Sequence, residues 1–443
     1  MRDNLKQNPA KCSKSKEAGK IFKVASGNFM EMYDFAVYGF YAAFIAQTFF
    51  PSDSEFIAVL KSFIAYGVGF LMRPLGAVVL GAFMDKHGRR NGLLLTLSIM
   101  ALGTFSIAIC PSYEQIGYLA PIIVVIGRLL QGFSAGAEVG GASVYLAEIA
   151  PKGLRGFYVS WQSGSQQIAT IFAGLIGLGM YYLLGDQLTS EWGWRIPFFI
   201  GCLIIPFILY IRRSLEETPE FKATAHKAPK TFKAMMASVS QNYKIIILAV
   251  MFVMMTTVTF YFITAYTPRF ATKALGLTKF DAFTLTAIIG LSNLFWLPLS
   301  GYLGDKIGRK PIVLTMTTIG LLTAYPALNF LTSGDVSFTK VVMVELWLSF
   351  IFGAYNGVMV VSLSEFVPKE IKALGFSLAY SITVAIFGGF TPVVSEILIE
   401  KTKNPASPAY WLTFAAFCSF VSAFILFKKG GVYDKARSEA WEK

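Results

Sequence analysis

The sequence is poor in charged residues. Asp, Glu, Lys and Arg together make up only 15% of its 443 residues, whereas a soluble domain carries roughly 25%. Hydrophobic residues make up 55% and aromatic residues 15%, so much of the folded surface must face lipid instead of water. This composition excludes an ordinary soluble enzyme and indicates an integral membrane protein.

Cysteine and histidine are scarce as well. The chain has two histidines, and its four cysteines (Cys12, Cys110, Cys202 and Cys418) include no pair at the spacing of a metal or redox site. Neither a disulfide framework nor a zinc site is therefore indicated. Because no nucleophile–base pair, metal-ligand set or phosphate-binding loop is recognisable either, we expect no enzymatic activity, no metal and no cofactor.

The net charge of +13 would suggest nucleic acid as a partner in a soluble protein. Its distribution argues against that, because most Lys and Arg lie near the chain ends and in every second connection between apolar stretches. This positive-inside bias predicts that both termini lie in the cytoplasm. Residues 1–20 are polar and basic without an apolar core, so we expect a cytoplasmic tail and no cleavable signal peptide.

Apolar stretches of roughly membrane-spanning length follow one another along the whole chain. Their bounds are about 21–50, 56–84, 93–110, 116–146, 157–184, 194–211, 245–270, 280–303, 312–331, 341–363, 374–399 and 411–427. The stretches therefore predict twelve transmembrane helices.

A charged motif occurs twice, 220 residues apart. Residues 81–90 read Gly-Ala-Phe-Met-Asp-Lys-His-Gly-Arg-Arg, and residues 301–310 read Gly-Tyr-Leu-Gly-Asp-Lys-Ile-Gly-Arg-Lys. A second pair of similar segments, at 148–151 and 365–368, has nearly the same offset. Internal repeats of this kind are typical of secondary transporters.

The two copies of the motif resemble the loop signature of the major facilitator superfamily, where it joins helices 2 and 3 and helices 8 and 9. The resemblance implies an all-α membrane protein whose twelve transmembrane helices form two six-helix bundles related by a pseudo-twofold axis. We expect a cytoplasmic tail at 1–20, bundles at 21–211 and 245–427, a basic cytoplasmic linker at 212–244 and a cytoplasmic tail at 428–443.

Ionisable side chains inside the apolar stretches are functional candidates, because each costs at least about 2.5–3.5 kcal/mol to insert. Arg73 and Arg128 are the natural ligands for substrate carboxylates, since a guanidinium binds a carboxylate in bidentate fashion. Asp34, Glu138 and Glu31 are candidate proton carriers, because removal from water favours the neutral carboxyl group. The alternative is that Asp34 pairs with one of the arginines and serves packing alone.

Uncharged polar side chains in the same stretches complete the expected substrate site. They are Asn28, Tyr66, Gln131, Gln162, Ser163, Gln166, Tyr261, Thr264, Asn293, Asn356 and Tyr380. For Thr264 the alternative is a hydrogen bond to its own helix backbone. Pro268, Pro298 and Pro392 predict bends in their helices, and small residues at 132, 135, 136 and 140 predict close approach of a neighbouring helix.

Charged residues in and just after the repeated segments are candidates for holding one side of the transporter shut. They are Asp85, Arg89, Arg90, Glu148, Arg155, Asp305, Arg309 and Glu365. The alternative is that these loops only set the topology. Arg195, within the segment Trp-Gly-Trp-Arg at 192–195, is a candidate for gating or for anchoring at the membrane interface.

Several segments narrow the family further. Residues 27–35, 70–76, 127–132 and 192–197 resemble the metabolite–proton symporters. Residues 160–167, 256–264, 292–298 and 385–392 are similar to the tricarboxylate carriers within that group. The resemblance implies a multi-pass protein of the bacterial inner membrane that imports citrate or a related tricarboxylate by alternating access, with H⁺ as the coupling ion.

The resemblance leaves other substrates open. Tricarballylate, α-ketoglutarate, another dicarboxylate, or a zwitterion such as proline or betaine would fit the same group, and a transporter-like sensor that moves nothing is a further alternative. The expected partners are the small-molecule substrate and the lipid bilayer, with no nucleic acid, and we expect a monomer.

Overall fold

The computed structural model describes residues 26–87, 89–136, 138–151, 153–213, 240–367 and 372–428. Within these ranges the chain is built of helices and contains no strand. The tail predicted at 1–20, most of the linker and nearly all of the C-terminal tail lie outside the described residues. The gap at 214–239 separates the described chain into two halves.

The N-terminal half contains six helical passes, several of them interrupted. It begins with helix at 26–40 and continues with α2 (Ala42–Phe49), α3 (Glu55–Leu71), α4 (Arg73–His87), α5 (Arg89–Ile109), α6 (Tyr113–Ile116), α7 (Leu119–Ala135), α8 (Glu138–Ile149), α9 (Arg155–Glu191), η1 (Gly193–Arg195) and α10 (Ile196–Arg213).

The C-terminal half contains six further passes. They consist of α13 (Tyr243–Tyr261), η2 (Phe262–Tyr266), α14 (Thr267–Arg269), η3 (Phe270–Ala274), α15 (Lys279–Ile307), α16 (Arg309–Thr332), α17 (Phe338–Phe366), α18 (Lys372–Thr383), η5 (Val384–Gly388), α19 (Thr391–Thr402) and α20 (Pro408–Leu426). The passes agree with the twelve apolar stretches of the sequence to within a few residues.

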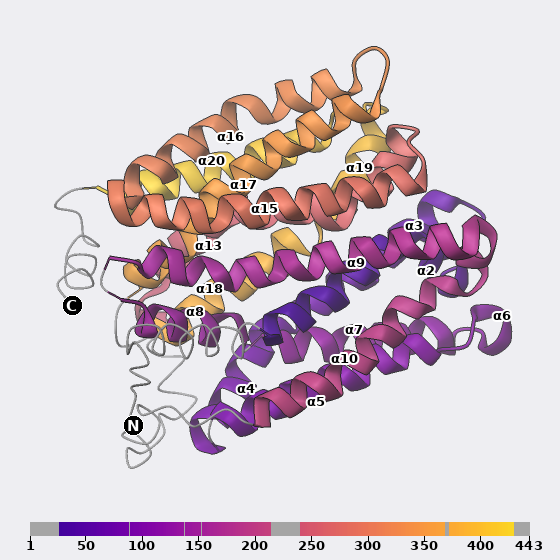
Figure 1. Ribbon diagram of the computed structural model, residues 1–443, viewed down its shortest axis with the longest axis horizontal. Helices are drawn as coiled ribbons and strands as arrows, with labels where there is room; N and C mark the ends of the chain where they lie inside the picture. Colours follow the sequence, from indigo (N-terminus) through magenta and orange to yellow (C-terminus); the bar gives the residue numbers. More distant parts are fainter. Residues whose placement is uncertain are drawn as a thin grey trace, which may run out of the picture.

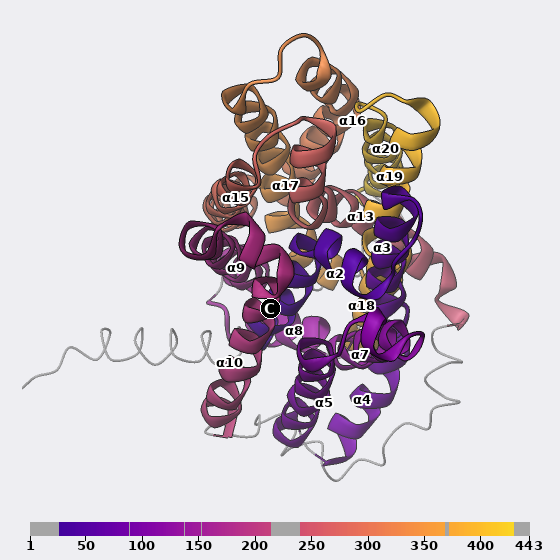
Figure 2. The ribbon, with the colours of Figure 1, turned by 90° about the vertical axis from the view of Figure 1, so that its right-hand side faces the viewer.

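The two halves form two bundles whose helices run along the long axis of the molecule (Figure 1). Seen from one end, α15, α16, α17 and α20 lie in one bundle, and α4, α5, α7 and α10 lie in the other (Figure 2). The bundles meet along α9 and α15, along α3 with η5 and α19, and along α18 with α4 and α8. Sites between the bundles are therefore lined by both halves of the chain.

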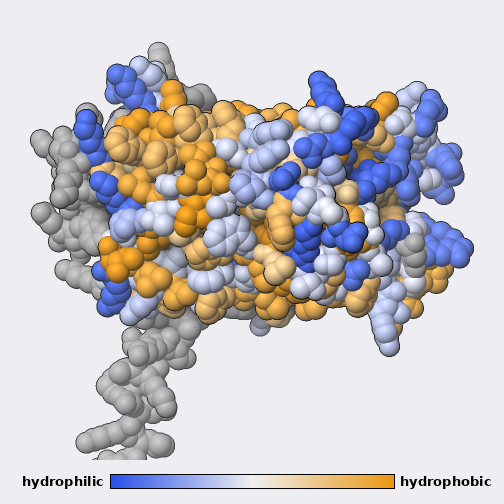
Figure 3. Space-filling view, turned by 90° about the horizontal axis from the view of Figure 1, so that it is seen from above, coloured by the Kyte–Doolittle hydropathy of each residue, from blue (hydrophilic) through white to orange (hydrophobic). Residues whose placement is uncertain are grey.

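Nine helices of the described chain are long and apolar enough to cross a membrane, and 94–109 and 193–208 form shorter apolar helices. Apolar residues cover much of the face seen in Figure 3, while hydrophilic residues gather towards its right-hand end. Large apolar side chains such as Leu203, Tyr182 and Phe424 are 76%, 84% and 64% exposed. In water such exposure would be costly, so these helices suit a lipid environment.

Close packing on α7 follows its small residues. A Cβ atom at Gly132 would lie 1.6 Å from the carbonyl oxygen of Gly69 on α3, and one at Gly136 would lie 2.0 Å from that of Arg73. Gly140 of α8 faces Ser377 of α18 across the bundle boundary. The predicted close approach of neighbouring helices is thus confirmed at these positions.

Two of the three predicted bends coincide with a change in helix type. The π-helical segment η2 comes just before Pro268, and η5 comes just before Pro392. Proline has no backbone N–H to donate, so the regular hydrogen-bond ladder is interrupted there. Pro298 instead lies within the uninterrupted helix α15. Both π segments belong to helices that reach the boundary between the bundles.

Two ends of the molecule are distinguished by their ion pairs. Glu55 at the start of α3 contacts Arg269 and Lys273, and α15 begins a few residues after Lys273. Asp305 lies at the far end of that 29-residue helix, about 40 Å away at 1.5 Å per residue. We refer to these as the Glu55 end and the Asp305 end.

Candidate functional site

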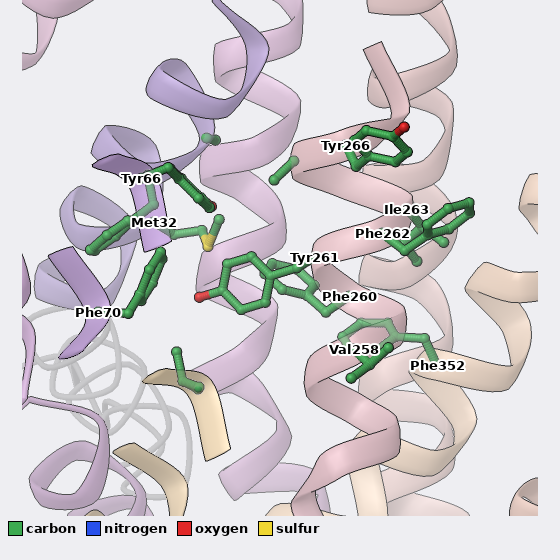
Figure 4. Packing of buried hydrophobic residues seen from close by; sticks show 14 of the residues in the cluster. Met32, Tyr66, Phe70, Val258, Phe260, Tyr261, Phe262, Ile263, Tyr266 and Phe352 are labelled. Carbon is green, nitrogen blue, oxygen red and sulfur yellow. The ribbon is translucent and has the colours of Figure 1, made fainter. Parts of the chain in front are cut away.

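A small cavity lined by both polar and apolar side chains lies between the bundles. Its lining residues come from both halves of the chain: Glu31, Met32, Arg73, Gln166, Thr256, Thr257, Phe260, Tyr261, Phe352, Asn356, Tyr380 and Val384. Its volume of about 10 Å³ has room for roughly one water molecule. Figure 4 shows four of these lining residues, Met32, Phe260, Tyr261 and Phe352, with Tyr261 extending from α13 towards Phe70 of the other half.

One wall of the cavity carries a buried ion pair. Nη2 of Arg73 donates to Oε1 of Glu31 at 2.5 Å, and the side chains are 5% and 1% exposed. Glu31 lies on the first pass and Arg73 at the start of α4, immediately after the break at Met72. A buried charge is stable only when it is paired. The pair therefore keeps the guanidinium of Arg73 at the cavity wall, neutralised by Glu31.

Arg128 is buried behind this wall and is not among the residues that line the cavity. Its guanidinium carbon lies 4.4 Å from the ring centre of Phe35, 4.6 Å from that of Tyr38 and 4.9 Å from that of Tyr66. Arg73 contacts Phe35 from a distance of 4.8 Å. The two predicted carboxylate ligands thus share an aromatic ring, with only Arg73 facing the cavity.

Asp34 belongs to a buried hydrogen-bond network in the N-terminal bundle. It accepts hydrogen bonds from the Thr104 hydroxyl and from Nε2 of Gln131, the latter at 3.4 Å. Gln131 in turn accepts from Nη1 of Arg128 at 2.6 Å. The network links a carboxylate to a guanidinium through an amide. It contains three of the predicted residues, next to the cavity rather than on its surface.

The remaining predicted residues of the N-terminal half occupy different places. Gln166 lines the cavity, and Tyr66 contacts both Arg128 and Tyr261 by its ring. Asn28 is 1% exposed, and neither atom of its amide group has a hydrogen-bond partner among the described residues. Gln162 accepts from the Ser163 hydroxyl at 3.0 Å, away from the cavity lining.

The predicted residues of the C-terminal half divide in the same way. Tyr261, Asn356 and Tyr380 line the cavity. Asn293 of α15 instead donates to Gln167 of α9 at 3.0 Å, and this hydrogen bond joins the two bundles. Thr264 donates to the carbonyl of Phe260 in its own helix at 2.5 Å. This is the backbone hydrogen bond considered above as the alternative to a role in substrate binding.

Two further predicted residues are buried in the N-terminal half. Glu138 is 3% exposed at the start of α8 and does not line the cavity. Arg195 donates to the carbonyl of Ala108 at 3.0 Å and lies 5.3 Å from the ring centre of Phe49. These contacts of Arg195 all lie within its own bundle.

The Asp305 end carries contacts between the bundles. The carboxylate of Asp305 accepts hydrogen bonds from the backbone N–H groups of Gly156 and Phe157, at 2.9 and 3.1 Å. These N–H groups lie in the first turn of helix α9, so a residue of the C-terminal half caps a helix of the N-terminal half.

Arg309 contacts both Asp305, at 3.3 Å, and Glu365, and Arg155 is the first residue of α9. Several predicted gating residues thus meet at the Asp305 end. The side chains of Asp85, Arg89, Arg90 and Glu148 lie outside the part of the structure whose side chains are described.

The sequence did not identify the apolar part of the cavity. Met32, Phe260, Phe352 and Val384 line it together with Thr256 and Thr257. Aromatic and aliphatic residues are ordinary in a transmembrane helix, so nothing in the sequence distinguishes those that face a cavity. Thr257 differs from these residues, because its position one turn before Tyr261 makes it a polar candidate of the same helix face.

The comparisons with known proteins agree with this architecture. The family model described as "Sugar (and other) transporter" matches residues 20–433. The chain belongs to this family. It is 52% identical over 414 residues to a citrate-proton symporter of Klebsiella pneumoniae, covering 94% of this chain and 93% of that protein. It is 48% identical over 423 residues to a citrate-proton symporter of Salmonella typhi, covering 96% and 97%.

Solved structures show the same fold. A structure of the major facilitator superfamily proton:xylose symporter XylE matches with a TM-score of 0.74 at 18% identity, covering 95% of this chain and 98% of that chain. A partially occluded inward open conformation of XylE from E. coli matches with a TM-score of 0.73. The twelve helices in two bundles are therefore the fold of the major facilitator superfamily.

Proposed function

We propose that the protein is a proton-coupled symporter that carries citrate or a related tricarboxylate across the bacterial inner membrane. The observation that carries the proposal is the buried arginine–carboxylate pair on the cavity between the bundles. A cation held at this place suits an anionic substrate. The similarity over most of the chain to two citrate-proton symporters supports both the substrate class and the coupling ion.

Coupling follows from the competition for Arg73. While Glu31 is charged, it occupies the guanidinium at 2.5 Å. A proton on Glu31 removes the charge from this partner, and a substrate carboxylate then becomes the better ligand for Arg73. Proton binding and substrate binding therefore favour each other, which is the linkage that symport needs. Asp34 and Glu138, which do not line the cavity, remain candidates for the same role.

Alternating access then consists of opening one end while the other stays closed. The Asp305 end is closed by the cap on α9, and the Glu55 end by ion pairs that cross between the bundles. The small volume of the cavity means that substrate binds only when the bundles separate at one end. The charge distribution of the loops supports a cytoplasmic Asp305 end and cytoplasmic termini.

The leading rival is a symporter of another organic acid or of a zwitterion. Relatives named as proline/betaine transporters are 35% identical to this chain, compared with 52% for the citrate-proton symporter of K. pneumoniae. In the proposed coupling Glu31 is protonated when substrate binds, so the cavity then offers the Arg73 cation without a counter-anion. This arrangement suits an anion better than a zwitterion, whose cationic group would lack a partner. The sensor alternative predicts binding without movement.

The test is uptake of labelled citrate into proteoliposomes, with and without an imposed proton gradient. The proposal expects accumulation that requires the gradient and that unlabelled tricarballylate inhibits more strongly than proline or betaine does. Uptake that does not depend on the proton gradient would contradict the proposed proton coupling. Binding of citrate without any uptake would favour a sensor, and preferential uptake of proline would favour the zwitterion carriers.

A further inference from the structure

An ion cluster joins the two bundles at the Glu55 end. Nη1 of Arg269 lies 2.7 Å from Oε1 of Glu55, and Nζ of Lys273 lies 2.7 Å from Oε2 of the same carboxylate. Glu55 belongs to the N-terminal half, and both cations belong to the last turns of the α13–η3 pass. Each carboxylate oxygen thus has its own cation, which is how a pair of cations would also hold a carboxylate of a substrate.

Arg269 is held independently of Glu55. Nε of Arg269 donates to Oε1 of Glu396 at 3.1 Å, and Glu396 also accepts from the Tyr266 hydroxyl at 3.2 Å. Glu396 and Arg269 are each 10% exposed, whereas the Glu55 side chain is 51% exposed. Removal of Glu55 would therefore leave Arg269 in place within its own bundle. Arg269 would keep Glu396, and Lys273, which is 59% exposed, would lose the Glu55 carboxylate.

The cluster continues into the central cavity along one face of α3. Phe63, Tyr66 and Phe70 follow Glu55 at helical spacing and end at Arg73 on the cavity wall. Two of these rings contact aromatic rings of the other bundle. The ring centre of Phe63 lies 5.9 Å from that of Tyr266, and the ring centre of Phe70 lies 5.2 Å from that of Tyr261.

Figure 4 shows Tyr266, Tyr261 and Tyr66 along this boundary. The path from the cluster to Arg73 is therefore the seam that must part when the Glu55 end opens.

We propose that Arg269 and Lys273 form an outer binding site for a substrate carboxylate, and that the incoming anion takes the place of Glu55. The replacement removes the contact that ties α3 to the C-terminal bundle, so capture of substrate and opening of the Glu55 end are one event. The inference rests on the proposed function, because it requires a polycarboxylate substrate that arrives from this side.

The proposal differs from a simple latch in a measurable way. Neutralising Glu55 or neutralising Lys273 breaks the same ion pair, so a latch predicts the same direction of change for both variants. A carboxylate site predicts opposite directions. Glu55→Gln removes the competitor and should lower the KM for external substrate, whereas Lys273→Gln removes a ligand and should raise it. Exposed ion pairs contribute about 0.2–1 kcal/mol, so we expect shifts of up to about fivefold.

The experiment measures initial rates of citrate uptake in right-side-out membrane vesicles for the wild type, Glu55→Gln, Lys273→Gln and Lys403→Gln. Lys403 is 72% exposed and pairs with Glu400 of its own bundle, so its variant matches the loss of one positive charge without touching the seam. Efflux from vesicles loaded with citrate gives the KM from the other side. We expect opposite shifts of the external KM for the first two variants, and no shift for Lys403→Gln or for the internal KM.

Each other outcome overturns the inference. Shifts in the same direction would make the cluster a latch only. An increase in KM for Lys403→Gln as large as that for Lys273→Gln would make it a general effect of surface charge. Unchanged values in both cluster variants would remove any role in capture. Failure of the wild type to accumulate citrate or tricarballylate would reject the proposed function as well, and is seen before any variant is compared.

Discussion

Glu31 lies 2.5 Å from Arg73, and both side chains line the cavity between the bundles. Asp34, one turn further along the same helix, instead contacts Thr104 and Gln131 within the N-terminal bundle. The two acids therefore differ in what a proton would change. Protonation of Glu31 releases the cation at the cavity, whereas protonation of Asp34 alters a network behind it.

We predict that Glu31→Gln separates binding from proton coupling. The amide mimics a permanently protonated acid, so Arg73 stays available for substrate while no proton is exchanged. Counterflow of labelled citrate should persist, and accumulation driven by a proton gradient should be lost. The matched variant is Asp34→Asn, which should keep at least part of the accumulation. If the two variants behave in the opposite way, Asp34 is the coupling group.

A second prediction distinguishes the two arginines. Arg73→Lys keeps the charge but loses the planar fork that binds a carboxylate with two hydrogen bonds. The affinity for citrate should fall by about 1–3 kcal/mol, the range of a charge-assisted hydrogen bond. Arg128→Lys removes contacts with Phe35 and Tyr38, so it should lower thermal stability more than affinity. Binding and melting of purified protein measure both; equal losses of affinity would place Arg128 in the binding site.

The sequence predicted the passes well because lipid imposes their length and composition. The stretch expected at 280–303 is α15, Lys279–Ile307, and the repeated charged motif begins within its last turns. The breaks at Tyr41 and Met72 and the π segments were not predicted, except for the bends at two prolines. Such breaks depend on the packing of neighbouring helices, which a single apolar pattern does not record.

The cavity was predictable only in part, for a related reason. Helical spacing placed Glu31 and Asp34 on one face of the first pass, but the angle between passes decides which of them meets Arg73. The sequence likewise offered Arg128 as a second ligand at the cavity, and only the structure encloses it between Phe35 and Tyr66. The pairing of Glu55 with Arg269 joins residues 214 apart, and no local pattern indicates it.

A third prediction concerns sidedness. In a chain whose native cysteines are replaced, a cysteine at Lys306 should react with a membrane-impermeant thiol reagent only from the cytoplasmic side. A cysteine at Lys403 should react only from the periplasmic side, because α15 and α19 end on opposite sides of the membrane under the proposed topology. Intact cells and inverted vesicles provide the two exposures. Reaction of both positions from one side would overturn the arrangement of the C-terminal bundle.

The final prediction tests whether closure of the Asp305 end is needed for transport. A Cβ atom at Gly156 would lie 2.4 Å from the carbonyl oxygen of Gly301 and 2.9 Å from Oδ1 of Asp305. Cβ atoms essentially never approach another heavy atom to within 3.0 Å. The first distance involves backbone, which cannot move aside without separating α9 from α15. Gly156→Ala should therefore hold this end open, although alanine itself favours a helix.

Two measurements follow on that variant. Steady-state citrate uptake should fall about tenfold or more. A tenfold loss corresponds to about 1.4 kcal/mol in the equilibrium between the open and closed states of the Asp305 end. A cysteine at Ser377, which faces Gly140 across the boundary, should label faster from the Asp305 side. The control is Gly179→Ala on the same helix α9, where an added Cβ has no neighbour within 4 Å. Normal uptake in Gly156→Ala would show that the contact between Gly156 and Gly301 is not part of the transport cycle.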